Sequence, residues 1–152
     1  MESKIKEYGY GVLGRRSCSI KEFEEKLKKK FIDEDLSEDL SVEKKESLEN
    51  SIEKIISSFI EKGYLNDEDY VKSYIETHKY GYNKFKFIFQ QKGIEESIYE
   101  NILDENKERE LEEIIKNWKK FGKKPKEKKI ASLMGKGFLY NDIKKALEQF
   151  DD

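Results

Sequence analysis

The chain can be aligned with itself at a shift of 44 residues over most of its second half. Under this shift Gly93 meets Gly137, and an apolar residue follows each glycine. Apolar residues also meet one another: Tyr70 with Ile114, Val71 with Ile115, Tyr74 with Trp118, Phe89 with Leu133, Tyr99 with Ile143, and Leu103 with Leu147. Self-similarity at a period of about 20 to 50 residues is typical of stacked structural repeats. We therefore expect a repeat protein.

The first part of the chain joins this series at a shift of 62 residues, which carries Tyr8 onto Tyr70 and Phe23 onto Phe85. The difference between the two shifts indicates an insertion at about residues 32–49, where acidic residues dominate. We expect it to form a solvated loop or an extra helical turn. The predicted domains are repeat 1 at 1–63, repeat 2 at 64–104 and repeat 3 at 105–152.

Local patterns favour helices. The chain holds one proline and nine glycines, too few for a sandwich or barrel of many short strands. Ser19 and Glu22 form a capping-box pattern at a helix start, and Asn66 precedes the acidic first turn of another helix. Glycines inside the first predicted helix leave a strand at Tyr8–Leu13 as an alternative. We predict an all-α fold in which three tandem three-helix repeats form an elongated, curved body.

Residues typical of helix ends also agree with an all-α fold. Gly63, Gly93 and Gly137 suit left-handed helix ends, and Pro125 suits the first turn of a helix. Trp118 shares an apolar face with its neighbours, so we expect it in the core and not on a base-stacking surface.

Sequence motifs for catalysis are missing, so we predict no enzymatic activity, no metal site and no cofactor. One histidine and one cysteine cannot supply the usual zinc ligand sets. His78 continues an apolar helical face, and Cys18 precedes a helix cap, so we assign packing roles to both. The chain shows no long apolar run and no secretory leader, so we expect a cytoplasmic protein that does not enter the membrane.

Charge is unevenly spread although the net charge is −2. The lysine-rich segment, from Lys116 to Lys136, holds nine lysines and one acid. Because 28 of the 31 basic residues are lysines, a merely solvated face remains an alternative. The clustering favours an anionic partner such as nucleic-acid phosphate. The candidate residues of the segment are Lys116, Lys119, Lys120, Lys123, Lys124, Lys126, Lys128 and Lys129.

Three groups of residues resemble motifs of the RecX family of recombinase regulators. The segment Gly63-Tyr64-Leu65-Asn66-Asp67-Glu68-Asp69-Tyr70 is similar to that family's Gly-Tyr-Leu-Asp-Asp-x-x-Tyr/Phe signature. Leu13, Arg16, Ser19, Glu22, Phe23 and Leu27 are similar to its Leu-x-x-Arg-x-x-Ser-x-x-Glu-Leu-x-x-x-Leu segment. Lys92-Gly93-Ile94 and Lys136-Gly137-Phe138 are similar to its Lys-Gly-apolar ends. The resemblance runs from about Tyr8 to Phe150.

The resemblance implies a regulator that lies in the groove of the RecA filament, limits its growth and suppresses its ATPase and strand-exchange activities. It implies RecA as a partner, a role in DNA repair and recombination, and no catalysis. We expect a monomer, with Arg15, Arg16 and the lysines above as candidate contacts to RecA or to single- or double-stranded DNA. The signature residues themselves are expected to be structural: Gly63, Tyr64, Leu65, Asn66, Asp67, Tyr70, Gly93 and Gly137.

Two departures affect the expected contacts. Phe31 and Ile32 stand where the family usually shows glycine in the first repeat. The helix after Asn66 carries Glu76 and Lys79 where relatives tend to be arginine-rich. Two alternatives to the filament regulator therefore stay open, a lysine-rich helical DNA-binding module and a non-catalytic scaffold.

Overall fold

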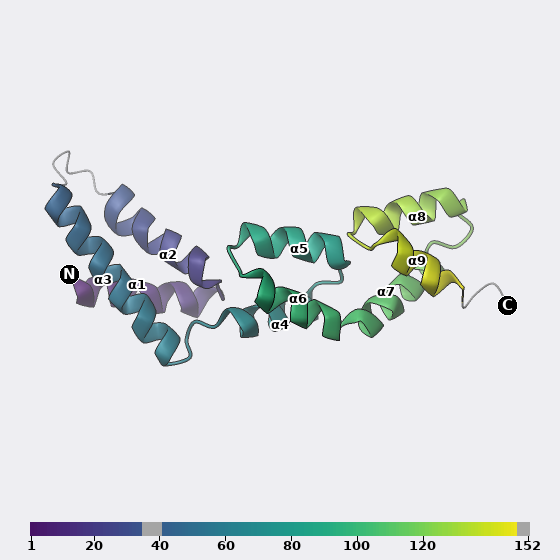
Figure 1. Ribbon diagram of the computed structural model, residues 1–152. Helices are drawn as coiled ribbons and strands as arrows, with labels where there is room; N and C mark the ends of the chain where they lie inside the picture. The colour runs from purple at the N-terminus through teal and green to yellow at the C-terminus, as the bar shows by residue number, and fades with distance from the viewer. Residues whose placement is uncertain (35–40, 149–152) are drawn as a thin grey trace. The chain divides into compact units, whose positions relative to one another are not determined.

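The computed structural model describes residues 1–34 and 41–148 and shows only helices in these ranges (Figure 1). The prediction of an all-α fold is confirmed for this part of the chain. The elements are α1 (Glu2–Arg15), α2 (Ile20–Lys28), the π-helical turn η1 (Lys29–Asp33), α3 (Val42–Glu61), α4 (Asp67–Thr77), α5 (Tyr82–Gln91), α6 (Glu96–Glu105), α7 (Lys107–Lys120), α8 (Lys126–Gly135) and α9 (Tyr140–Leu147). None of these helices is long and apolar enough to cross a membrane.

By its internal contacts the chain divides into two compact units. Unit 1 contains Met1–Tyr70 together with Lys92–Ile94, and unit 2 contains Val71–Gln91 together with the chain from Glu95 onward. The three-repeat division at residues 1–63, 64–104 and 105–152, and the elongated, curved body, stay predictions.

Helices α1, α2 and α3 pack on one another around the apolar core of unit 1. Phe23 and Phe59 are fully buried there, with ring centroids 5.5 Å apart. The alternative of a strand at Tyr8–Leu13 is wrong, because these residues lie within α1. Gly9 sits in the helix for a packing reason: a Cβ atom at this position would lie 3.0 Å from the Phe23 ring and 3.2 Å from the Phe59 ring.

Most of the described part of the acidic insertion, residues 32–34 and 41–49, is helical. Residues 42–49 form the first turns of α3, and Leu48 is the single buried side chain among them. Ser41 caps this helix by accepting a hydrogen bond from the backbone N–H of Lys44 at 3.1 Å. Residues 35–40 of the insertion lie outside the described ranges, so the choice between a solvated loop and an extra helical turn stays a prediction for the insertion as a whole.

Unit 2 has two groups of apolar contacts. Aromatic rings from α4, α5 and α6 meet in the first, where Phe89 lies 5.6 Å from Tyr74 and 6.0 Å from Tyr99 by ring centroids. The second joins α7, α8 and α9 around fully buried Ile114 and Phe138. Trp118 packs against this second group but is only half-buried, so it lies at the edge of the core in which the sequence predicted it.

Candidate functional site

The start of α2 is fixed by a network that we call the first joint (Ser19, Ile20, Glu22, Asp67 and Lys92). The predicted capping box is present: the Glu22 N–H donates to Ser19 Oγ at 3.2 Å, and the Ser19 N–H donates to Glu22 Oε1 at 3.2 Å. Ser19 is fully buried, and its hydroxyl donates to the backbone oxygen of Lys92 at 2.8 Å. A residue 73 positions away thus completes this helix start.

Two further contacts close the first joint. The Ile20 N–H donates to Asp67 Oδ1 at 2.8 Å, and Lys92 Nζ lies 3.1 Å from Glu22 Oε2. Burial alone would raise the pKa of Glu22, but the hydrogen bonds from Ser19 and Lys92 outweigh it and hold this pKa below its ordinary value. The charged form of Glu22 therefore stabilises the joint.

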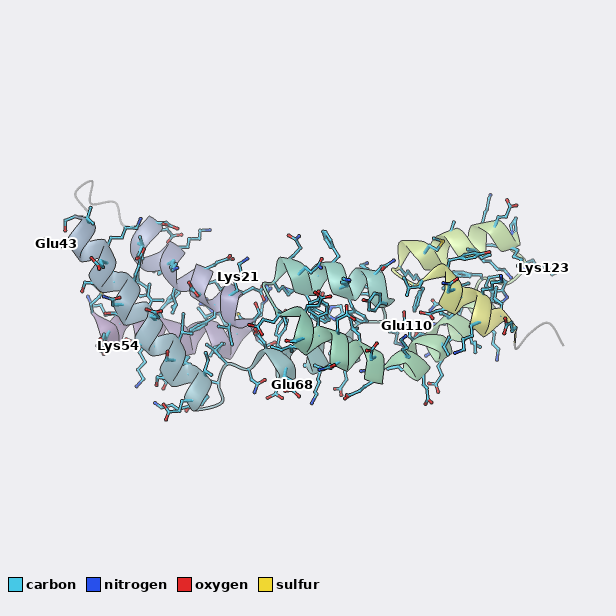
Figure 2. The ribbon with its side chains drawn as sticks, in the orientation of Figure 1. Lys21, Glu43, Lys54, Glu68, Glu110 and Lys123 are labelled. Carbon is cyan, nitrogen blue, oxygen red and sulfur yellow. The ribbon has the colours of Figure 1, made fainter. Side chains whose placement is uncertain are left out.

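The start of α5 is held in a closely similar way by the second joint (Gly81, Tyr82, Asn83, Glu110, Lys136 and Gly137). The Gly81 N–H donates to the Lys136 backbone oxygen at 2.9 Å. The Tyr82 N–H donates to Glu110 Oε1 at 2.8 Å, and Figure 2 labels Glu110 on α7. Burial raises the pKa of Glu110, partly offset by the hydrogen bond from Tyr82.

The two joints correspond at the shifts found in the sequence. Ser19 and Gly81 are 62 residues apart, and Lys92 and Lys136 are 44 residues apart. In each joint a Lys-Gly turn meets the start of an earlier helix, α2 or α5. The N–H of the first residue of that helix donates to a carboxylate on a later helix, from Ile20 of α2 to Asp67 of α4 and from Tyr82 of α5 to Glu110 of α7.

Most signature residues lie at helix ends or in the core. Gly63 ends α3 with a φ of 80°, Leu65 and Tyr70 are buried, and Asn66 accepts a hydrogen bond from the Asp69 N–H at 3.0 Å. Tyr64 differs, because 52% of it is exposed.

The lysine-rich segment covers the end of α7, the following turn and α8, and its eight candidate lysines lie between the end of α7 and the start of α8. Seven of its eight candidate lysines are exposed, and Figure 2 labels Lys123 in the turn. Pro125, predicted in the first turn of a helix, is the N-cap residue immediately before α8. Lys126, Lys128 and Lys129 lie at the positive end of α8, where lysine is unfavourable for the helix. Helix stability therefore does not explain these three charges.

Some lysines of this segment contact aromatic rings. Lys129 is half-buried, and its Nζ atom lies 4.7 Å from the Trp118 ring centroid. Lys124 Nζ lies 5.6 Å from the Phe121 ring centroid. These cation–π contacts hold both lysines against the α7–α8 turn.

Arg15 and Arg16 lie in unit 1, at a surface that the sequence did not predict. They line a groove of about 590 Å³ with three lysines from α2 and η1. We call it the basic groove; its lining residues are Tyr8, Val12, Arg15, Arg16, Lys26, Lys29, Lys30 and Glu34. Lys29 and Lys30 follow Lys26 by three and four residues, which places the three lysines on one helical face. This spacing is the one feature of the sequence that could have indicated the basic groove.

The histidine and the cysteine have local packing contacts. His78 stacks on Tyr74 with ring centroids 3.9 Å apart, and its Nδ1 lies 3.0 Å from the Tyr74 backbone oxygen. Cys18 is buried, which raises the pKa of its thiol. Within residues 1–34 and 41–148, no group of three or more His, Cys, Asp and Glu residues is placed to hold a metal ion.

The chain is similar to proteins named "Regulatory protein RecX". It is 30% identical over 150 residues to the one from Streptococcus pneumoniae strain Hungary19A-6, a match that covers 91% of this chain and 52% of the relative. The chain belongs to the RecX family. The RecX protein of Clostridium tetani is 35% identical over 111 residues, covering 64% of this chain and 51% of the relative. No family model matches the chain.

Solved RecX structures share the fold. The crystal structure of RecX from Lactobacillus salivarius matches 99% of this chain and 96% of its own chain, with a TM-score of 0.73 and 23% identity. A second crystal structure of a regulatory protein RecX gives a TM-score of 0.69 at 19% identity, over 97% of this chain and 73% of the other. The chain spans about half the length of the two curated RecX relatives described above.

Proposed function

We propose that the chain is a non-catalytic regulator that binds the RecA nucleoprotein filament and inhibits RecA ATPase, filament extension and recombination. The observation that carries this proposal is the 30% identity over 150 residues to proteins named "Regulatory protein RecX". The ordered motifs support the same assignment, because the signature residues and both Lys-Gly turns take part in helix ends and joints.

The basic residues are the proposed contacts. A RecA filament on DNA carries a dense array of phosphates, and exposed lysines and arginines bind such an array through charge. The exposed members of the lysine-rich segment and the exposed Arg15 and Arg16 have this chemistry. The proposal also includes a cytoplasmic location and action as a monomer.

The test is a titration of the full chain into RecA assembled on single-stranded DNA, with ATP hydrolysis and filament length as readouts. We expect hydrolysis to slow and growing filaments to stall as the protein is added. Unchanged hydrolysis at every ratio of the two proteins rejects the proposal.

A charge variant tests which surface makes the contact. The change replaces four lysines of the segment by glutamine: Lys119, Lys120, Lys123 and Lys124. The matched control replaces four exposed lysines elsewhere in unit 2: Lys79, Lys107, Lys144 and Lys145. Both variants lose the same charge. If only the variant of the lysine-rich segment inhibits RecA more weakly, the segment contacts the filament. If the two variants inhibit equally, the segment is not part of the contact.

A second candidate function is direct nucleic-acid binding through the lysine-rich segment. It is favoured by Lys126, Lys128 and Lys129, whose charges at the start of α8 oppose the helix dipole. Binding to DNA without RecA should then weaken with salt, and the four-lysine variant described above should show a shallower salt dependence. A salt dependence equal to that of the wild type removes those four lysines from the footprint.

A further inference from the structure

We propose that the basic groove of unit 1 binds the phosphodiester backbone of single-stranded nucleic acid. This site is separate from the lysine-rich segment and does not depend on binding to RecA. Its volume of about 590 Å³ lies within the range of ligand pockets, about 300 to 1,000 Å³.

The groove is positively charged, although the chain as a whole is slightly negative. Five basic side chains line it with one acid, Glu34, whereas the whole chain has a net charge of −2. Glu22, whose Oε2 lies 3.3 Å from Arg16 Nη2, and the helix ends at Arg15 and Asp33, each with about half an elementary negative charge, reduce this excess but leave it positive. The groove therefore attracts anions.

The kind of basic residue points to phosphate. The chain has three arginines in all, and two of them, Arg15 and Arg16, line this groove. Arginine binds phosphate oxygens in a planar, two-pronged geometry that lysine cannot reproduce. Arg15 Nε donates to the Gly11 backbone oxygen at 3.2 Å, and Arg16 Nη2 lies 3.3 Å from Glu22 Oε2. Each of these bonds uses one of the five donors of a guanidinium and orients the rest.

The lysines widen the same surface. Lys26 lies on α2, and Lys29 and Lys30 lie on the π-helical turn η1 that continues it. Turns of this type occur often at functional sites. Lys29 and Lys30 are exposed and Lys26 is half-buried, so two of the three lysines are accessible to a ligand from solvent.

An aromatic wall favours a single strand over an acidic peptide. Tyr8 lines the groove, held edge-on against Phe31 with ring centroids 5.6 Å apart at 87°. Lys30 Nζ lies over the Tyr8 ring, 5.8 Å from its centroid, so a cation and an aromatic face occur together in the groove. An aromatic face beside basic residues is the pattern that stacks an unpaired base while the cations hold the backbone. A duplex keeps its bases paired inside and cannot use Tyr8 in this way.

The test measures binding of the full chain to a fluorescein-labelled oligothymidylate of about 15 nucleotides by anisotropy, over a series of salt concentrations without RecA. The variant replaces Lys26, Lys29 and Lys30 by glutamine. If these three lysines contact phosphates, the slope of log affinity against log salt should become shallower by about 2, and affinity at roughly 0.1 M salt should fall about a hundredfold. An unchanged slope overturns the proposal.

Two further variants guard against a general effect of charge. The control within unit 1 replaces Lys44, Lys45 and Lys62, which are exposed and do not line the groove. It loses the same charge and should change the salt slope by less than half as much as the groove variant does; an equal change overturns the proposal. Tyr8→Leu should weaken binding about fivefold without changing the slope, because stacking is not ionic. Wild-type affinity in this variant overturns the assigned role of Tyr8.

Other ligands decide the remaining alternatives. A duplex of equal length should bind more weakly than the single strand, and tighter binding overturns the single-strand assignment. An oligoglutamate of equal charge should compete poorly, and equal competition assigns the groove to an acidic protein segment. If replacing Lys123, Lys124 and Lys126 removes the salt dependence and the groove variant does not, the second candidate function holds in place of this site.

Discussion

Replacing Gly137 by alanine tests the second joint. Gly137 has a φ of 95°, in the left-handed region that favours glycine. A Cβ atom here would lie 2.4 Å from the Cβ atom of Lys84 and 2.5 Å from its backbone nitrogen. Because one of these atoms belongs to the backbone of α5, a change of side-chain rotamer cannot relieve the overlap. The Lys136-Gly137 turn must move away from α5.

The expected cost has two parts. Alanine in a left-handed conformation costs about 1 to 2 kcal/mol. Moving the turn also lengthens or breaks the hydrogen bonds from Gly81 N–H to Lys136 O and from Asn83 N–H to Gly137 O, both 2.9 Å. Each such bond contributes about 1 kcal/mol. Gly137→Ala should therefore lower the free energy of unfolding by about 3 to 4 kcal/mol.

Gly122→Ala is the matched control for backbone strain. Gly122 also has a positive φ, 63°, but a Cβ atom added to it would have no neighbouring atom within 4 Å. This variant should lose only the strain energy, about 1 to 2 kcal/mol.

Urea unfolding measures both variants through the fluorescence of Trp118, the single tryptophan, which packs on the apolar group that contains Phe138. The Gly137 variant should unfold at a clearly lower urea concentration than the Gly122 variant. If the two free energies agree within about 0.5 kcal/mol, the close approach at the second joint does not stabilise unit 2 and the reasoning fails.

Three further predictions concern carboxylates of the joints. Asp67→Ala removes the acceptor of the Ile20 N–H and should cost about 1 kcal/mol in urea unfolding, whereas Asp67→Asn keeps an acceptor oxygen and should cost less. Glu22→Gln should be less stable than wild type at neutral pH. The pKa of Glu22 is lowered in the fold, so its contribution is complete above the ordinary value of 4.5 and is lost as pH falls through the lowered pKa. Thermal melts from neutral to strongly acidic pH should show this difference shrinking, and a constant difference would contradict it. Glu110→Gln should show the opposite trend, because burial raises the pKa of Glu110 and its contribution is complete below 4.5 and lost as pH rises through the raised pKa. At neutral pH this variant should match or exceed wild type, since a glutamine oxygen still accepts the Tyr82 N–H; a clear loss of Tm there counts against the assignment.

The helices and their ends were predictable because their determinants are local. The capping box at Ser19 and Glu22 and the cap at Asn66 each join residues three apart, so the sequence alone contains the pattern. The left-handed turns at Gly93 and Gly137 follow from residue type and position.

The joints and the basic groove were not predictable in this way. The acidic first turn after Asn66 suggested a favourable helix start, but the bond from the Ile20 N–H to Asp67 spans 47 residues. Lys26 and Lys29 form a basic surface with Arg15 only because α1 packs on α2. Contacts of this kind depend on how distant helices pack, which the spacing of residues within one helix does not determine.

The first joint has a consequence for the order of folding during synthesis. The buried Ser19 hydroxyl and the Ile20 N–H receive their partners from Lys92 and Asp67, residues that leave the ribosome much later than α2 itself. While only α1 to α3 have been made, these polar groups must stay in water, and the tip of α2 cannot be buried. A nascent chain arrested before residue 92 should therefore expose this tip to proteases, and one extended beyond the Lys92-Gly93 turn should protect it.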